Sequence, residues 1–240
     1  MRQVPVARES PPIGIVGDGR VARHFCRYFH LLGRPFLAWS RRTSTVPPPE
    51  ALASCPTVLL LIRDEAIEPF VGAWPALRDR RLVHCSGGLV TPVAEAAHPL
   101  MTFGPELYDL DTYRTIPFVL DSGGTPFPQL LPGLPNPFFT IPAAERPCYH
   151  ALCVMAGNFS SLLWLKLFEE MQTRFAMPAS AAHPYLLRTM QNLLADGRRA
   201  LTGPFSRGDD RTIAANLQSL AGDPFQAVYL AFARIHESRH

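Results

Sequence analysis

Two histidines in the first half of the chain are placed where they could transfer protons. His84 ends an apolar run and is followed by Ser86 and Gly87, and His98 precedes a proline. Imidazole exchanges protons near neutral pH, and the proline biases His98 toward an extended backbone. We predict His84 and His98 as catalytic and Ser86 and Gly87 as substrate-binding, through a hydroxyl and a backbone N–H. The alternative is an ordinary strand-to-loop turn with a packed histidine.

His150 and Asn158 form a second candidate pair, in a predicted helix of the second half. A four-residue spacing through Val154 places them on one side of that helix. The remainder of that face is apolar, and a buried asparagine needs a hydrogen-bond partner. The partner is either a substrate or nicotinamide amide, which would make both residues catalytic, or a neighbouring carbonyl group.

The segment 201–209 reads Leu-Thr-Gly-Pro-Phe-Ser-Arg-Gly-Asp. Its two glycines and its proline predict a rigid turn between two helices. Thr202 and Arg207 could hold an anion there, and we predict them as substrate-binding. Asp209 could cap the following helix. A purely structural loop is the alternative.

The histidines and cysteines do not predict a metal centre. His84, Cys85 and His98 could suggest zinc, but the sequence offers no fourth ligand at a suitable spacing. The five cysteines are odd in number and contain no Cys-x-x-Cys pair, which favours a reduced, cytoplasmic setting. Residues 1–12 lack the apolar core of a signal peptide. No stretch approaches the roughly 20 apolar residues that span a bilayer, so we expect no membrane partner.

These side chains need a scaffold, and the N-terminal part of the chain predicts one. The apolar run 13–16 leads into Gly-Asp-Gly-Arg-Val-Ala and then into a helix-like stretch. A strand, tight turn and helix of this kind bind a dinucleotide pyrophosphate, because the glycines permit the turn and close approach. The predicted contacts are Gly17, Asp18, Gly19, Arg20, Val21 and Ala22. The Asp18 carboxylate counts against binding unless Arg20 offsets it or it points outward.

The second predicted strand, 35–40, indicates which dinucleotide is bound. An NAD site places an acidic residue at its end, but here the chain reads Ser40-Arg41-Arg42. Guanidinium groups pair with phosphate oxygens in bidentate geometry. We therefore predict NADP, with Ser40, Arg41 and Arg42 at its 2′-phosphate. The alternative is a solvated turn.

The order of elements predicts the fold class and the domains. Strands are expected at 13–17, 35–40, 57–62, 81–85, 116–120 and 137–141. Helices are expected at 19–32, about 65–78, 91–97, 144–173, 179–201, 211–221 and 224–238. This is an α/β chain, with an N-terminal Rossmann-like, mostly parallel sheet over residues 1–143 and an all-helical C-terminal domain over residues 144–240. Ligands of such sheets lie beyond the carboxyl ends of the strands, so we expect an interdomain cleft.

Composition excludes some functions. The 240 residues carry a net charge of +3, which gives no electrostatic argument for a nucleic-acid partner. The apolar fraction of 47% and the charged fraction of 18% are those of an ordinary soluble protein.

Read in order, these motifs resemble a known family. The Gly-x-Gly-Arg-Val-Ala turn, His-x-Ser-Gly, His-Pro-Leu, Tyr-His and Leu-Thr-Gly-Pro-x-x-Arg-Gly-Asp look like those of Rossmann-like oxidoreductases with an uncharacterised helical C-terminal domain. That family is similar in architecture to pyrroline-5-carboxylate reductase, ketopantoate reductase and the 6-phosphogluconate or β-hydroxyacid dehydrogenases. The resemblance implies an NADP-binding domain, a helical domain that forms homodimers, and reductase or dehydrogenase activity.

The chain departs from the β-hydroxyacid dehydrogenases at one position. Those enzymes place a catalytic lysine four residues before the asparagine, where this chain has Val154. Lys166 is the only lysine, and we expect it to extend outward. The sequence therefore favours a lysine-free NADP-dependent oxidoreductase that transfers a hydride to or from a small polar substrate. The alternatives are a non-catalytic NADP(H)-binding sensor or partner protein, and a helical interaction domain on a vestigial Rossmann fold.

Overall fold

A computed structural model describes residues 10–197 and 199–237 and divides the chain into two compact units. The first unit ends at Ser160 and the second begins at Ser161. The first unit therefore extends past the predicted boundary at 143/144, because the helix that starts at Arg146 contacts the sheet. Residues 1–9, on which most of the signal-peptide prediction rests, lie outside the described residues, as do positions 198 and 238 of two predicted helices.

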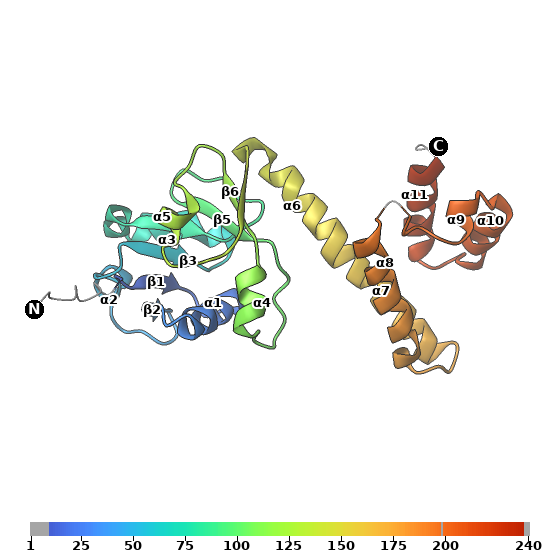
Figure 1. Ribbon diagram of the computed structural model, residues 1–240, viewed down its shortest axis with the longest axis horizontal. Coiled ribbons are helices and arrows are strands. Elements are labelled where there is room, and N and C mark those ends of the chain that lie inside the picture. The colour runs from blue at the N-terminus through green and yellow to red at the C-terminus, as the bar shows by residue number, and fades with distance from the viewer. Residues whose placement is uncertain (1–9, 198, 238–240) are drawn as a thin grey trace, which may run out of the picture. The chain divides into compact units, whose positions relative to one another are not determined.

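The first unit is built on one sheet of seven strands (Figure 1). The strands are β1 (Ile13–Val16), β2 (Phe36–Trp39), β3 (Thr57–Leu60), β4 (Arg81–His84), β5 (Glu95–Pro99), β6 (Phe118–Asp121) and β7 (Phe138–Ile141). Their order is β2-β1-β3-β4-β5-β6-β7, and every neighbouring pair is parallel except β5 and β6. The predicted α/β class with a mostly parallel sheet is confirmed.

Helices cover both faces of this sheet. One apolar core joins the sheet to α1 (Arg20–Leu31), α4 (Leu110–Thr115) and α5 (Phe127–Leu130). The other joins it to α2 (Pro48–Ala51), α3 (Asp64–Ala73) and the 3-10 helix η1 (Pro75–Asp79). The central strands β1 and β3 are buried along their whole length, as strands covered on both faces must be.

One predicted element was wrong in type. Residues 91–97 do not form the expected helix: 91–94 are a turn and 95–97 begin β5. The helices α2 and α4 were not predicted. Alanine favours a helix locally, but Ala96 and Ala97 are buried in the sheet, where β5 pairs with β4 and β6. Tertiary pairing therefore overrides the local preference, and it brings His98 to the same edge of the sheet as the end of β4.

A run of helical segments leads from the sheet into the second unit. It contains the 3-10 helix η2 (Ala143–Glu145), α6 (Arg146–Val154), the π-helical turn η3 (Met155–Phe159) and α7 (Ser160–Thr173). The second unit continues with η4 (Ala179–Ala182), α8 (His183–Ala195), α9 (Pro204–Arg207), α10 (Asp210–Ser219) and α11 (Phe225–Glu237).

The contacts of two side chains in the second unit can be compared with the sequence predictions. Asp209 caps α10, since its carboxylate accepts a 3.0 Å hydrogen bond from the backbone N–H of Thr212, as predicted. Lys166 was expected to extend outward, but its side chain forms ion pairs instead. Its ammonium group pairs with Glu170 at 2.7 Å and with Asp223 at 2.6 Å, so it ties α7 to the segment before α11.

The sequence was expected to contain no segment that is long and apolar enough to span a bilayer, and that expectation was wrong. The helical run Ala143–Thr173 is long and apolar enough to cross a membrane, with a mean hydropathy of 1.5 in its most apolar window. The window passes because its leucines, alanines and cysteines are interrupted by few charges. Length and composition do not separate a membrane span from a helix that another protein surface covers.

Candidate active site

The turn after β1 has the geometry that a pyrophosphate needs. Gly17 has φ +127°, and a Cβ there would overlap the carbonyl oxygen of Leu61, so only glycine fits. No protein atom lies within 4 Å of the place a Cβ would take at Gly19, which leaves open space in front of the α1 N-terminus. Ala22 is buried where α1 packs on the sheet. The residues present therefore fit a dinucleotide.

Asp18 does not stand as an isolated charge in this turn. Its carboxylate accepts a 2.7 Å hydrogen bond from Nε of Arg42, which follows the end of β2. This bond is the main reason that the pKa of Asp18 is lowered. Arg20 does not offset the charge, because its guanidinium donates to the carbonyl oxygen of Phe103 at 3.3 Å. The sequence did not predict that Asp18 and Arg42 would engage each other.

The residues predicted to bind the 2′-phosphate differ in whether their polar groups are free to contact a ligand. Ser40 is buried, and its hydroxyl is hydrogen bonded to that of Thr43 at 2.8 Å. Arg41 is exposed and has no polar partner among the described residues. A cavity of about 480 Å³ opens beside this turn, between α1 and β2. Its basic lining residues Arg23 and Arg27 come from α1, and the motif did not single them out.

Several candidate side chains lie at the carboxyl ends of β4 and β5. The Tyr149 hydroxyl and Nδ1 of His98 are hydrogen bonded at 2.9 Å. The ring of His150 lies 5.9 Å from that of His98, centroid to centroid. His84 is the last residue of β4 and is fully buried. The structure thus brings His98 and His150 together with Tyr149, a residue of the Tyr-His motif that the sequence did not predict as catalytic.

The hydroxyl of the Ser-Gly-Gly turn makes its contacts within the chain, and the predicted substrate-binding role of Ser86 and Gly87 stays a prediction. The Ser86 hydroxyl donates to Asp64 at 2.5 Å and accepts hydrogen bonds from the backbone N–H groups of Gly88 and Leu89. These polar groups are therefore occupied within the chain. Gly87 supplies space, since a side chain there would overlap the imidazole of His150.

Burial decides the protonation states at this edge. It lowers the pKa of His84 to about 4, and the positive charge of Arg146 adds to the effect. The pKa of His98 is also lowered to about 4, mainly by burial and then by His150. Both imidazoles are therefore neutral at neutral pH and are poor proton donors. Burial raises the pKa of Tyr149, so its phenol keeps its proton at neutral pH and presents an O–H group at this edge.

Arg146 fixes the start of α6 on the sheet. Its guanidinium is fully buried, and Nε donates to Asp121 at the end of β6 at 2.5 Å while Nη2 donates to the carbonyl oxygen of Val119 at 3.1 Å. A buried charge needs such partners. The sequence did not predict this pair, although an aspartate directly after a predicted strand was a usable signal.

The remaining predicted residues are exposed. Asn158 lies in the π-helical turn η3. Thr202 and Arg207 are exposed beside α9 in the second unit. Within residues 10–197 and 199–237, no three His, Cys, Asp or Glu side chains are grouped as metal ligands.

Comparisons with known proteins agree with this architecture. Residues 127–235 match the model of a domain of unknown function, DUF2520. No curated protein sequence matches the chain. A solved structure of a proposed NADP oxidoreductase, BF3122 from Bacteroides fragilis, is 20% identical with a TM-score of 0.75, over 95% of this chain and 99% of that one.

Two further solved structures are similar in fold. A reductive aminase from Aspergillus terreus in complex with NADPH and ethyl-5-oxohexanoate is 15% identical, with a TM-score of 0.64 over 95% of this chain and 93% of that one. An imine reductase from Streptomyces aurantiacus is 16% identical, with a TM-score of 0.64 over 93% of both chains. The predicted resemblance to Rossmann-like oxidoreductases with an uncharacterised helical domain is confirmed. The more specific likeness to pyrroline-5-carboxylate reductase, ketopantoate reductase and the dehydrogenases stays a prediction.

Proposed function

We propose that this chain is an NADPH-dependent reductase of small polar imines or carbonyl compounds. The observation that carries the proposal is the hydrogen bond between Tyr149 and His98 at the carboxyl edge of the sheet. The glycine turn at Gly17 lies at the end of β1, on the same edge of the parallel strands. A cofactor turn and a proton donor at one edge are the two parts that such a reduction requires.

Each part of the site has a defined task. Gly17, Gly19 and the N-terminus of α1 bind the pyrophosphate, and a bound nicotinamide supplies the hydride. The Tyr149 hydroxyl gives a proton to the substrate nitrogen or oxygen, which would balance the hydride that a bound cofactor would supply to the carbon of the C=N or C=O bond. The neutral imidazole of His98, in hydrogen-bond contact, returns a proton from solvent to the phenolate.

The cofactor is NADP(H) in this proposal. Arg41 and Arg42 follow β2, where a 2′-phosphate is bound in folds of this kind. One protein of similar fold is named as an NADP oxidoreductase, and the reductive aminase of similar fold was solved in complex with NADPH. We assign the 2′-phosphate first to Arg41, because Arg42 is already engaged by Asp18.

Titration of the purified chain with NADPH and NADH tests this assignment. A ligand that binds only the native state raises the melting temperature, so NADPH should raise it by more than NADH does at the same concentration. The proposal also expects NADPH oxidation when a cyclic imine or a ketoester is added. A correctly folded chain that binds neither coenzyme at millimolar concentration would overturn the proposal.

The second candidate function is a non-catalytic NADP(H)-binding protein. The specific observations in its favour are the lack of a lysine at Val154 and the neutral, buried imidazoles of His84 and His98. This alternative predicts that the chain binds NADPH as tightly as the reductase proposal expects. It predicts no NADPH oxidation with any imine or carbonyl substrate.

We also propose that the chain forms a homodimer through its helices. In the second unit, the buried apolar side chains are only Met171, Ala182 and Ala233 among the residues described there, too few for a core. Large apolar side chains of α7 and α8 are open instead, with Leu165 at 59% and Leu194 at 88% exposure. A second copy would supply the missing core.

The charge pattern favours protein over lipid as the cover of these helices. Lys166 and Glu170 of α7 form an ion-paired group with Asp223, which precedes α11, and α8 is too short to span a bilayer. Light scattering should therefore give twice the chain mass in buffer without detergent. A monomer that floats with phosphatidylcholine vesicles would contradict the dimer and favour a membrane surface.

A further inference from the structure

The sheet has a gap beside the start of β4, where β5 does not pair with it. Strands β4 and β5 pair through only two residues each, so Arg81 and Leu82 have no strand beside them on that side. The connection 85–94 contains no helix, whereas parallel strands are usually joined by one that covers the sheet. A cavity of about 630 Å³ remains, which is the size of a small-molecule site.

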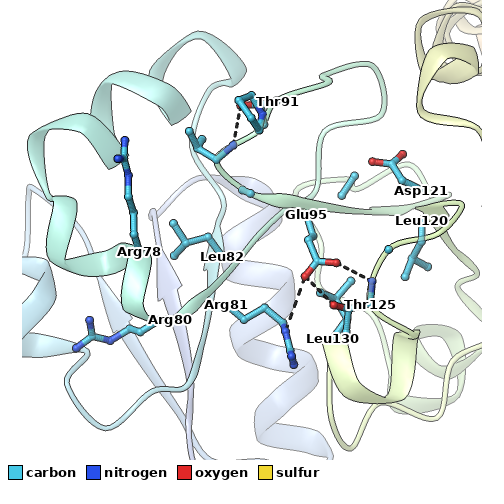
Figure 2. Close-up of a pocket in the computed structure, with 15 residues that line it drawn as sticks. Arg78, Arg80, Arg81, Leu82, Thr91, Glu95, Leu120, Asp121, Thr125 and Leu130 are labelled. Carbon is cyan, nitrogen blue, oxygen red and sulfur yellow. Dashed lines mark hydrogen bonds and ion pairs between the residues drawn. The ribbon is translucent and has the colours of Figure 1, made fainter.

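The lining of this cavity is apolar in its depth and basic at its rim. Leu82, Ala96, Leu120 and Leu130 line it from β4, β5, β6 and α5. Arg78, Arg80 and Arg81 also line it, as Figure 2 shows, together with Thr125 and the carboxylates of Glu95 and Asp121, of which Asp121 is paired with Arg146. An apolar body with one charged group is the kind of ligand that such a lining fits.

The three arginines are not equivalent. Arg80 is satisfied by the chain, since its guanidinium donates to the carbonyl oxygens of Leu52, Ala76 and Pro49 at 2.9–3.2 Å. Arg81 donates through Nη1 to the carbonyl oxygen of Gln129 at 2.6 Å, which leaves part of its donor set unused. Arg78 is exposed and has no polar partner in the described part of the chain. Arg78 and part of Arg81 therefore present N–H donors that have no hydrogen-bond partner in the described part of the chain.

Glu95 limits the charge of the ligand. Its carboxylate accepts hydrogen bonds from the backbone N–H and the hydroxyl of Thr125, at 2.8 and 2.9 Å, and lies 3.8 Å from Nε of Arg81 (Figure 2). These contacts hold a negative charge inside the cavity. A ligand with a second anionic group would meet repulsion there, so a monoanion fits best.

We propose that this cavity is a second ligand site, for a small organic anion with one carboxylate and an apolar body. The carboxylate pairs with Arg78, and the apolar body lies on Leu82 and Leu120. The site lies over β4, β5 and β6, whereas Gly17 follows β1, and β3 lies between β1 and β4 in the sheet. It is therefore separate from the cofactor site and does not depend on the proposed reductase activity.

Benzoate is a suitable probe, and benzyl alcohol is its uncharged counterpart. In a ligand-observed NMR titration of the full chain, benzoate should bind saturably and benzyl alcohol about tenfold more weakly. Arg78→Gln should weaken benzoate binding by about tenfold, because the substitution removes the charged partner. Arg211→Gln, at an exposed arginine of α10, should leave the binding unchanged. Saturating NADPH should not displace the probe.

Three results would overturn the proposal. These are the absence of saturable benzoate binding, equal binding to the wild type and to Arg78→Gln, and displacement of benzoate by NADPH. The last would place the probe in the cofactor site. A chain that binds benzoate in this pattern but binds no NADPH would retain this site while the reductase proposal fails. Since Arg78 is exposed, the variant should keep the wild-type melting temperature, which checks that it is folded.

Discussion

The imidazole of His150 packs directly against the backbone of Gly87. A Cβ atom added at Gly87 would overlap Nδ1 of His150 and lie 3.0 Å from its Cε1. This close approach lets α6 sit near enough to the sheet for Tyr149 to reach His98. One glycine in the connection after β4 therefore supports the geometry of the whole candidate site.

Gly87→Ala should destabilise the chain. The added methyl group must displace a half-buried imidazole, and overpacking of this kind costs about 1–3 kcal/mol of unfolding free energy. Urea denaturation measures it. Adding His150→Ala to the variant should recover most of the loss by removing the ring.

Gly72→Ala is the matched control for that substitution. A Cβ at Gly72 meets no atom within 4 Å, and the residue lies in α3. Alanine should therefore stabilise the helix by about 0.5–1 kcal/mol. If Gly87→Ala were no worse than this control, the packing of His150 against Gly87 would not matter to stability.

Tyr149→Phe should separate binding from chemistry. The variant lacks the proposed proton donor, and losing such a group lowers kcat by about 10²–10⁴-fold. NADPH affinity should not change, because the cofactor turn lies on other elements. Steady-state NADPH oxidation with a cyclic imine and a fluorescence titration measure the two quantities. Tyr185→Phe, at an exposed tyrosine of α8, is the control, and full turnover by Tyr149→Phe would exclude the phenol as donor.

Arg41→Ala should weaken NADPH much more than NADH. The side chain is exposed and has no polar partner among the described residues, so its loss should affect only the 2′-phosphate. A charge-assisted contact of this kind is worth about tenfold in affinity. Arg188→Ala, on the exposed face of α8, should change neither affinity. Equal losses for both coenzymes would remove Arg41 from the phosphate site.

His84 should make the stability depend on pH. Its pKa is lowered from 6.5 to about 4 in the folded chain, so the unfolded chain binds more protons between these values. Stability should therefore fall as the pH drops from 6.5 toward 4, by up to about 3 kcal/mol. Unfolding free energies from urea titrations at several pH values measure this slope.

His84→Gln should make that slope shallower without abolishing it. The contribution of His98 remains, because its pKa is lowered in the same direction. His30→Gln, at an exposed position of α1, should leave the slope as it is. An unchanged slope in His84→Gln would show that this imidazole does not titrate as its burial implies.

Local patterns in the sequence determined a large part of the fold. The apolar runs predicted six of the seven strands, and an apolar run followed by Gly-x-Gly-x-x-Ala and a helix-like stretch identified the turn at Gly17. These predictions succeed because a strand, a tight turn and a helix start depend on residues that are neighbours in the chain. The cap at Asp209 was predictable for the same reason.

The tertiary structure alone decided how the site is assembled. It made 95–99 a strand, paired Asp18 with Arg42, turned the Ser86 hydroxyl toward Asp64 and joined His98 to Tyr149. Each of these contacts connects residues more than a helical turn or a hairpin apart, so no local spacing encodes it. Burial is likewise a property of the packed molecule. It shifts the preferred proton donor from the histidines to a tyrosine, because removing water from an imidazole disfavours its charged form.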